Sequence, residues 1–183
     1  MRTILPEHLS TPARDRDTAL RARYDRAPES AWSTHIAWTE TAGADARDAS
    51  RGTVQVGLDG TELGYALERR VGGPHDDLGP RDLFCASIAA CFDSTIRMVA
   101  GRLGIGVEKV TVVVTGDVDA RGVLGDAAVP SGFQSLRVHV DLRLAGGDNA
   151  AIANRIIEVA SRRSVLLETL RNAIPVEIVE LPS

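Results

Sequence analysis

The stretch that decides the fold of this chain is residues 79–103, GPRDLFCASIAACFDSTIRMVAGRL. Pro80 suits the first position of a helix, where its missing N–H costs nothing, and Gly104 is typical of a helix end. A helix that is apolar on several faces must be buried nearly all round. The sequence therefore predicts one long, buried helix. Its apolar side chains are Leu83, Phe84, Ile88, Phe92, Ile96, Val99 and Leu103.

The segments on either side of this helix carry strand patterns. Asp59-Gly60 is a hairpin turn signal between two of the strands. Residues 133–144 alternate strictly between apolar and polar side chains, which is typical of an antiparallel strand with one wet face. Strands joined by hairpins, with the helices grouped together, indicate an α+β fold class. We expect strands at 32–39, 52–58, 62–68, 107–119, 133–144 and 175–181, and helices at 14–26, 149–163 and from Ser164 onward, with Asp148 and Ser164 as helix caps.

Size and composition limit the possible functions. The 183 residues predict a single domain, with an N-terminal arm and helix at 1–31 and the core at 32–181. A net charge of −4 gives no electrostatic reason to expect nucleic acid or an anionic membrane as a partner. No run of about 18 apolar residues is present, so we expect no membrane span. The polar N-terminus is unlike a secretory signal, so we expect a cytoplasmic protein without a structural disulfide.

The long helix is apolar on more faces than one sheet can cover. A second subunit that covers the remaining face is the simplest remedy. We therefore predict an intimate homodimer.

Several motifs, in this order, resemble the OsmC/Ohr family. Residues 80–92 carry P-x-x-L-F-x-A-x-x-A-A-C-F, and an R-L-G-I segment follows at 102–105. The stretch 111–119 contains V-x-V-x-G-D-V-D, and 132–138 reads G-F-x-x-L-R-V. Residues 23–31, RYDRAPESA, resemble a subgroup with an extra N-terminal helix. The resemblance implies an intertwined homodimer with two long central helices and active sites at the subunit interface.

The resemblance also implies a chemistry and a set of residues. Characterised members of the family are thiol peroxidases that reduce organic hydroperoxides in oxidative stress defence. The attacking cysteine falls on Cys91, and the cysteine that would resolve it falls on Ser164. The glutamate that holds the supporting arginine falls on Arg81. The arginine itself falls in the loop between the first two strands, where Arg47 and Arg51 are both candidates.

Catalysis at Cys91 would need a thiolate, which burial in an apolar helix disfavours. Arg47, Arg51 or Arg81 is expected to supply the compensating positive charge. Without a second cysteine, an external thiol must resolve the sulfenic acid. Cys85 lies six residues earlier, about 9 Å along the helix and on another face, too far for a disulfide.

Each of these residues also has a plain structural interpretation. Cys91 could be a small buried apolar residue, Cys85 is expected to pack, and Ser164 suits a helix cap. Two functions therefore stand side by side. The first is a one-cysteine peroxidase that uses an external thiol reductant. The second is a non-catalytic OsmC-like protein that binds a small apolar ligand at the dimer interface, suggested by Ser164 and Arg81 at two functional positions.

Metal and cofactor motifs are not evident in the sequence. The four histidines lack metal-ligand spacing, and the glycine pairs do not follow a phosphate-binding pattern. We therefore expect neither metal nor cofactor. His75, in the loop before the long helix, is a candidate for a substrate contact or simply a solvated loop residue.

Overall fold

The computed structural model describes residues 13–41, 48–147 and 149–181. The chain divides into two compact units. Within the described residues, unit 1 takes in the chain up to Asp17, Ile88–Val113 and the chain from His139 onward, and unit 2 takes in Thr18–Ser87 and Val114–Val138. Four of the described helices and strands each include residues of both units, so the two units are interleaved along the sequence.

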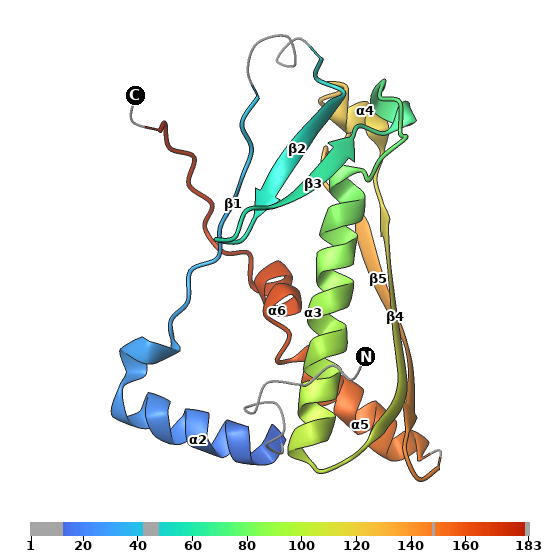
Figure 1. Cartoon of the computed structure of the whole chain (residues 1–183). Coiled ribbons are helices and arrows are strands. Elements are labelled where there is room, and N and C mark those ends of the chain that lie inside the picture. Colours follow the sequence, from blue (N-terminus) through green and yellow to red (C-terminus); the bar gives the residue numbers. More distant parts are fainter. Residues whose placement is uncertain (1–12, 42–47, 148, 182–183) are drawn as a thin grey trace, which may run out of the picture. The chain divides into compact units, whose positions relative to one another are not determined.

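The described elements alternate between short sheets and helices, in keeping with the predicted α+β class (Figure 1). Strands β1, β2 and β3 form one sheet, and β4 pairs with β5 in a second. In chain order the elements are α2 (Ala13–Arg26), η1 (Pro28–Ala31), β1 (Ala37–Trp38), β2 (Arg51–Val56), β3 (Thr61–Ala66), η3 (Arg69–Val71), α3 (Pro80–Arg102), β4 (Val107–Asp117), α4 (Ala120–Val123), β5 (Ser135–Leu144), α5 (Ala150–Ser161) and α6 (Val165–Asn172).

The hairpin of unit 2 forms where the sequence predicts it. Strands β2 and β3 pair antiparallel, from Arg51 opposite Ala66 to Val56 opposite Thr61. Gly60 in the turn has a φ of +66°, a left-handed conformation that glycine adopts without a steric penalty. The loop after β3 folds back on the sheet, because the Ala66 N–H donates to the carbonyl of Leu78 at 3.0 Å.

The strict alternation of residues 133–144 is confirmed in β5. Its apolar residues are half-buried or buried, and the polar residues between them are exposed. The core of unit 1 is built from α3, α5 and the end of β5. Ile152 of α5 is 40% exposed, because the buried face of this helix is centred on Ala153, Ile156 and Ala160. Asp148, the predicted cap of this helix, lies outside the described residues, and Asn149 caps α5 by accepting from the Ile152 N–H at 3.1 Å.

Helix α3 matches its predicted bounds to within one residue, but one chain does not bury it all round. Its core residues are Ile88, Phe92, Thr95, Ile96, Val99 and Ala100. A second face, which carries Ala90, Ser94, Arg97 and Met98, is exposed. By length and composition alone α3 also meets the requirement for a membrane span, which the sequence analysis does not expect. The core helix of a folded domain meets the same requirement.

Two predicted strands are largely or wholly missing from the described chain. The strand at 32–39 is reduced to Ala37–Trp38, which pair with Gln55 and Val56 of β2. Residues 175–181 form no strand, and Val176 and Ile178 are 85% and 96% exposed. A strand is defined by its ladder to a neighbour, and in the described chain residues 175–181 have no such neighbour.

Candidate thiol site

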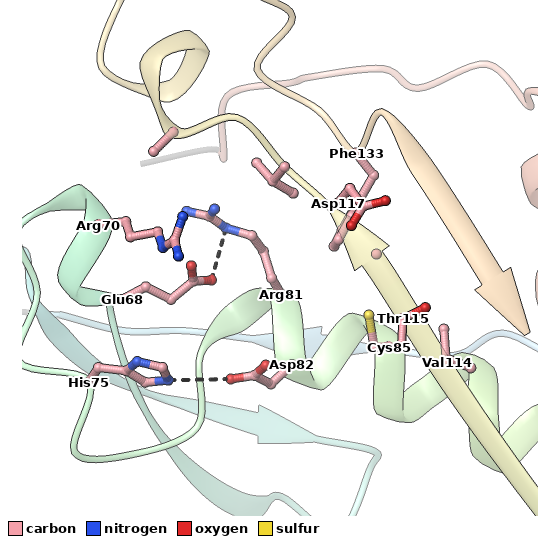
Figure 2. A pocket seen from close by; sticks show the side chains of 13 residues that line it. Glu68, Arg70, His75, Arg81, Asp82, Cys85, Val114, Thr115, Asp117 and Phe133 are labelled. Atoms are coloured by element: carbon pink, nitrogen blue, oxygen red, sulfur yellow. Dashed lines mark ion pairs between the residues drawn. The ribbon is translucent and has the colours of Figure 1, made fainter.

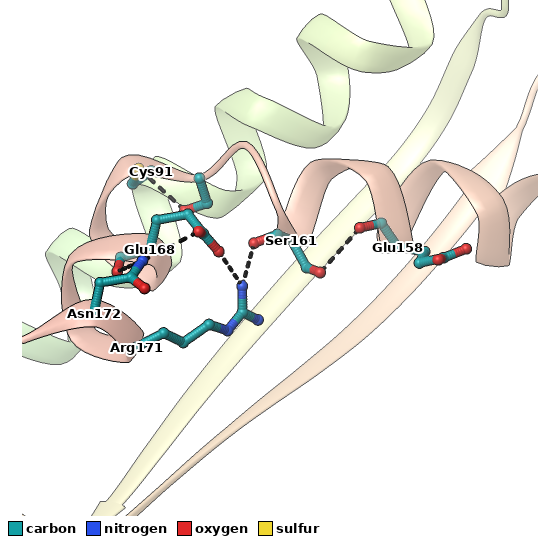
Figure 3. Close-up of polar contacts among 7 residues, drawn as sticks. Cys91, Glu158, Ser161, Glu168, Arg171 and Asn172 are labelled. Carbon is teal, nitrogen blue, oxygen red and sulfur yellow. Dashed lines mark hydrogen bonds and ion pairs between the residues drawn. The ribbon is translucent and has the colours of Figure 1, made fainter.

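Cys91 and Ser164 are brought together in unit 1. Cys91 lies on α3 and is half-buried, whereas Ser164 immediately precedes α6 and is completely buried. The Cys91 Sγ is 3.4 Å from the Ser164 Oγ, a hydrogen-bonding distance for sulfur (Figure 3). Of the site residues predicted from the sequence, these two meet directly although they are 73 residues apart in the chain.

The prediction that Ser164 caps α6 is confirmed for the position of the residue but not for its hydroxyl. Ser164 does occupy the N-cap position, and its carbonyl accepts the Glu168 N–H at 2.9 Å. Its hydroxyl, however, makes no capping hydrogen bond. A buried hydroxyl without a partner is costly, and the Cys91 sulfur supplies that partner here.

The turn between α5 and α6 holds Ser164 in place. The Ser164 N–H donates to the carbonyl of Ala160 at 2.9 Å, so the chain turns directly into the next helix. Arg171 of α6 donates to the carbonyl of Ser161 at 2.6 Å and to the Glu168 carboxylate at 2.7 Å (Figure 3). The bond from Arg171 to Ser161 joins α6 to the end of α5, so the backbone on both sides of Ser164 is held in place.

The backbone at Cys91 is held from within α3. Its carbonyl accepts a hydrogen bond from the Thr95 hydroxyl at 2.7 Å and from the Ser94 hydroxyl at 2.9 Å. Thr95 is buried, so its hydroxyl is satisfied by this carbonyl. Cys91 therefore sits on helical backbone within α3, and Ser164 sits at the N-cap position of α6.

Of the two arginines predicted to support Cys91 from the loop between the first strands, only Arg51 lies within the described residues. Arg47 lies outside the described residues. Arg51 begins β2 in unit 2 and donates to the Asp76 carboxylate at 2.5 Å. Both side chains are about half exposed. The hydrogen bond from Arg51 lowers the pKa of Asp76.

Arg81 has a partner that the sequence analysis missed. Its Nε lies 3.1 Å from Oε1 of Glu68, and the two side chains are only 25% and 21% exposed (Figure 2). The Glu68 carbonyl accepts the Val71 and Gly73 N–H groups at 3.1 and 3.0 Å, which fixes the chain where it leaves β3. Glu68 ends the predicted strand 62–68, and nothing in its sequence context singles it out.

His75 and Cys85 also lie in unit 2. The His75 Nε2 is 3.9 Å from Oδ2 of Asp82, an ion pair when the imidazole is protonated (Figure 2). Cys85 is half-buried, and burial, followed by the charge of Asp82, raises the pKa of its thiol. Both cysteines are free thiols. Among the described residues no group of three or more potential ligands could hold a metal ion.

The comparison with protein families assigns the chain. A family model described as OsmC-like protein matches residues 73–179, more than half of the sequence. The chain belongs to the OsmC family. The matched range includes Arg81, Cys91 and Ser164, and it begins after Arg51 and Glu68.

Solved OsmC-type structures share this fold. The organic hydroperoxide resistance protein OsmC of Legionella pneumophila is 26% identical, with 77% of this chain and 91% of that chain covered at a TM-score of 0.60. An OsmC-like protein of unknown function from Vibrio cholerae is 12% identical, with 75% and 94% covered and a TM-score of 0.62. An organic hydroperoxide resistance protein from Elizabethkingia anophelis is 23% identical, with 76% and 89% covered and a TM-score of 0.58. No curated protein matches the chain.

These likenesses confirm the predicted OsmC-type fold, in which antiparallel sheets accompany one long helix.

Proposed function

We propose that this OsmC-family protein is a cytoplasmic thiol peroxidase that reduces organic hydroperoxides in oxidative stress defence, with Cys91 as the attacking thiol and an external thiol as reductant. The observation that carries the proposal is the 3.4 Å contact between Cys91 and Ser164. It pairs a half-buried thiol with a hydroxyl at the position where the family resemblance expects a second thiol. The Legionella protein, which is 26% identical, is described as an organic hydroperoxide resistance protein, and this supports the same substrate class here.

The proposed reaction begins at the Cys91 sulfur. The thiolate forms a bond to the terminal oxygen of the hydroperoxide, the O–O bond breaks, and the departing alkoxide takes a proton from water to become an alcohol. Sulfur is oxidised to a sulfenic acid and the peroxide is reduced. A first external thiol then displaces the hydroxyl as water and leaves a mixed disulfide. A second external thiol attacks that disulfide, regenerates Cys91 and leaves as the oxidised disulfide of the reductant.

Ser164 decides which version of the cycle this chain can carry out. A hydroxyl cannot close a disulfide with Cys91, so the sulfenic acid has no internal resolving group at this position. The Ser164 hydroxyl can still donate a hydrogen bond to the sulfur or to the sulfenic oxygen. We propose that this contact holds the oxidised sulfur until the external thiol arrives.

The thiolate of the proposed cycle needs a positive charge. We propose that Arg51 or Arg81 provides it, with Arg47 as the third candidate. The ion pair with Glu68 supports Arg81 in this role, because a guanidinium held by a carboxylate keeps one orientation. The Arg81–Glu68 pair would then correspond to the family's arginine–glutamate pair, with the arginine in place of the glutamate on the long helix.

The proposed active form is a homodimer. The argument is the exposed face of α3, where Ala90 and Ser94 are small and Met98 is apolar. A partner helix could approach this face closely. Burial of the face by a second subunit would complete the environment of α3, of which Cys91 is part.

A binding role without catalysis is the second candidate. The observation that favours it is the chemistry of the thiol site itself, because Ser164 cannot resolve an oxidised Cys91. In this version the OsmC fold would bind a small apolar ligand at the dimer interface. Turnover separates the two candidates, because a binding protein would not consume peroxide catalytically.

The test is a turnover assay with the full chain. Cumene hydroperoxide and dithiothreitol are added, peroxide loss is followed, and mass spectrometry after dimedone trapping reports sulfenic acid on each cysteine. We expect multiple turnovers, a dimedone adduct on the Cys91 peptide and loss of both in Cys91→Ser. The Cys85 peptide, expected to remain unmodified, is the internal control. Stoichiometric or absent peroxide loss with unmodified Cys91 would overturn the peroxidase proposal.

A further inference from the structure

We propose that unit 2 carries a binding site for a small amphipathic monocarboxylate, whose carboxylate pairs with Arg70 and whose apolar body lies against Cys85, Val114 and Phe133. The site does not involve Cys91. Its cavity includes Arg81 and Glu68, which the peroxidase proposal also uses, but ligand binding can be measured without peroxide turnover.

The first observation is a cavity of about 540 Å³ (Figure 2). It lies between the start of α3, the end of β4 and the segment around η3, all within unit 2. Its volume is within the range of sites that take small organic ligands. Cys85, Val114, Val118 and Phe133 give it an apolar wall.

The apolar wall is a fixed surface. The Phe133 ring stacks on Phe84, with ring centroids 5.2 Å apart and planes 20° apart. Phe133 also packs directly over Gly116, because a Cβ at Gly116 would lie 2.5 Å from the ring. The raised pKa of Cys85 keeps its thiol neutral, which suits contact with an apolar group.

The second observation is the balance of charges at the polar end. Arg81 pairs with Glu68, and Asp82 faces His75. Arg70 makes no ion pair or side-chain hydrogen bond with the residues that the structure describes. Arg70, Arg81 and Glu68 all line this cavity, and all three are labelled in Figure 2. The donors of the Arg70 guanidinium are therefore available, and a ligand carboxylate can pair with a guanidinium through two parallel hydrogen bonds.

Asp117, the third acidic residue that lines the cavity, already has hydrogen-bond donors. Asp117 accepts hydrogen bonds from Ser135 at 2.5 Å and from Arg137 at 2.9 Å. Asp117 therefore does not compete for Arg70 as a partner. Together with Glu68 and Asp82, however, it makes the surroundings unfavourable for a doubly charged anion. The charge pattern thus favours a carboxylate over a phosphate monoester.

Arg70 also stands where two cavities meet. A neighbouring cavity of about 480 Å³ is lined by Arg70, Arg121, Gln134 and residues 117–120. Arg70, Asp117, Val118 and Ala120 line both cavities. A carboxylate bound at Arg70 can therefore face the second cavity while its hydrocarbon chain fills the first. This arrangement indicates a ligand with one charged end rather than a purely apolar molecule.

The experiment compares three probes of equal chain length on the full-length protein. Octanoate, octanol and octylammonium are titrated by calorimetry and by amide NMR. We expect octanoate to bind most tightly, with the largest shifts at Cys85, Val114 and Gly116. Arg70→Ala should weaken octanoate binding by about tenfold or more, since a charge-assisted hydrogen-bonded pair is lost, and should leave octanol binding unchanged.

Arg69→Ala is the matched control. Arg69 is the adjacent arginine of η3, it donates to the carbonyl of Pro74, and it does not line either cavity. This variant should retain octanoate affinity to within about twofold. Arg70 is exposed, so its replacement is expected to leave the fold intact, and the NMR spectrum of the variant verifies this.

Three results would overturn the site. They are equal binding of octanoate and octanol, unchanged octanoate affinity in Arg70→Ala, and shifts confined to residues outside unit 2. Protection of Cys85 from a methanethiosulfonate reagent by octanoate gives a second readout that needs no variant at Arg70. Octanoate should bind Cys91→Ser as tightly as the natural chain, so failure of the peroxidase proposal would leave this result unaffected.

Discussion

The sulfur of Cys91 lies 3.4 Å from the hydroxyl oxygen of Ser164, and that hydroxyl is completely buried. The contact joins α3 to the first residue before α6. It uses a hydroxyl that would otherwise cap the helix. An oxygen atom at position 164 allows only a one-cysteine cycle, whereas a sulfur atom there would allow a two-cysteine cycle.

Ser164→Cys should therefore create an internal resolving thiol. The two sulfur atoms of a disulfide lie about 2.05 Å apart. The 3.4 Å between the Cys91 Sγ and the Ser164 Oγ therefore leaves only a short approach for a sulfur atom at position 164. On addition of an alkyl hydroperoxide we expect a disulfide between Cys91 and the introduced thiol, measured by mass spectrometry of the unreduced protein. Ser161→Cys is the control, because the Ser161 hydroxyl donates back to the Glu158 carbonyl within α5. An oxidised Cys91 that stays unpaired in Ser164→Cys would contradict the prediction.

The Arg81–Glu68 pair should contribute to stability because both side chains are largely buried. Glu68→Gln leaves the guanidinium without its charged partner, and we expect a loss of about 1 kcal/mol in the free energy of unfolding. The exchanged double variant Glu68→Arg with Arg81→Glu should recover most of it. The natural chain, Glu68→Arg, Arg81→Glu and the exchanged double variant form a double-mutant cycle, and urea unfolding of these four proteins measures the coupling. Additive single effects would show that the 3.1 Å contact is not energetically coupled.

Asp119 should give unit 2 a distinct acid response. The hydrogen bond from the Arg121 side chain lowers the pKa of Asp119 from 3.8 to about 2. A depressed pKa in the folded state stabilises the fold fully above about pH 4, and this contribution is lost as the pH falls from about 4 towards 2. Carbon-13 NMR of the carboxyl group should give a midpoint near 2, and Arg121→Gln should move it up towards 3.8. A midpoint already near 3.8 in the natural chain would refute the assignment.

Gly116→Ala should destabilise the protein. The new Cβ would lie 2.5 Å from the Phe133 ring and 2.9 Å from Leu136. The ring is stacked on Phe84 and has little freedom to move, so overpacking of about 1–3 kcal/mol is expected. Gly132→Ala is the control, because a Cβ there meets nothing within 4 Å. Thermal and urea unfolding compare the two, and equal stabilities would argue against the close packing at Gly116.

The proposed homodimer should depend on the exposed face of α3. Ala90 and Ser94 are small and exposed on that face, so Ala90→Arg would place a long charged side chain where a partner helix must approach. We expect the natural chain to sediment as a dimer and Ala90→Arg as a monomer. Asn154→Arg, an exposed position on α5, should remain a dimer. A natural chain that sediments as a monomer at micromolar concentration would contradict the proposal.

The sequence by itself determined the elements whose hydrogen bonds and burial patterns are local. Helix α3 runs from Pro80 to Arg102 within the predicted 79–103, and β5 alternates as residues 133–144 predict. The turn at Asp59-Gly60 forms the expected hairpin. A helix satisfies its backbone within one segment and a short turn depends on its own residues, so periodicity and turn chemistry are enough.

Only the tertiary structure decided the contacts between segments far apart in the chain. The stretch 175–181 has strand composition but forms no strand without a neighbour to complete its ladder. Serine is a residue type that favours helix caps, yet the Ser164 hydroxyl contacts Cys91. Nothing in the sequence around Glu68 indicates a role, yet its carboxylate pairs with Arg81. Such partners are fixed by how distant backbones pack, and one sequence without its fold does not contain that distance information.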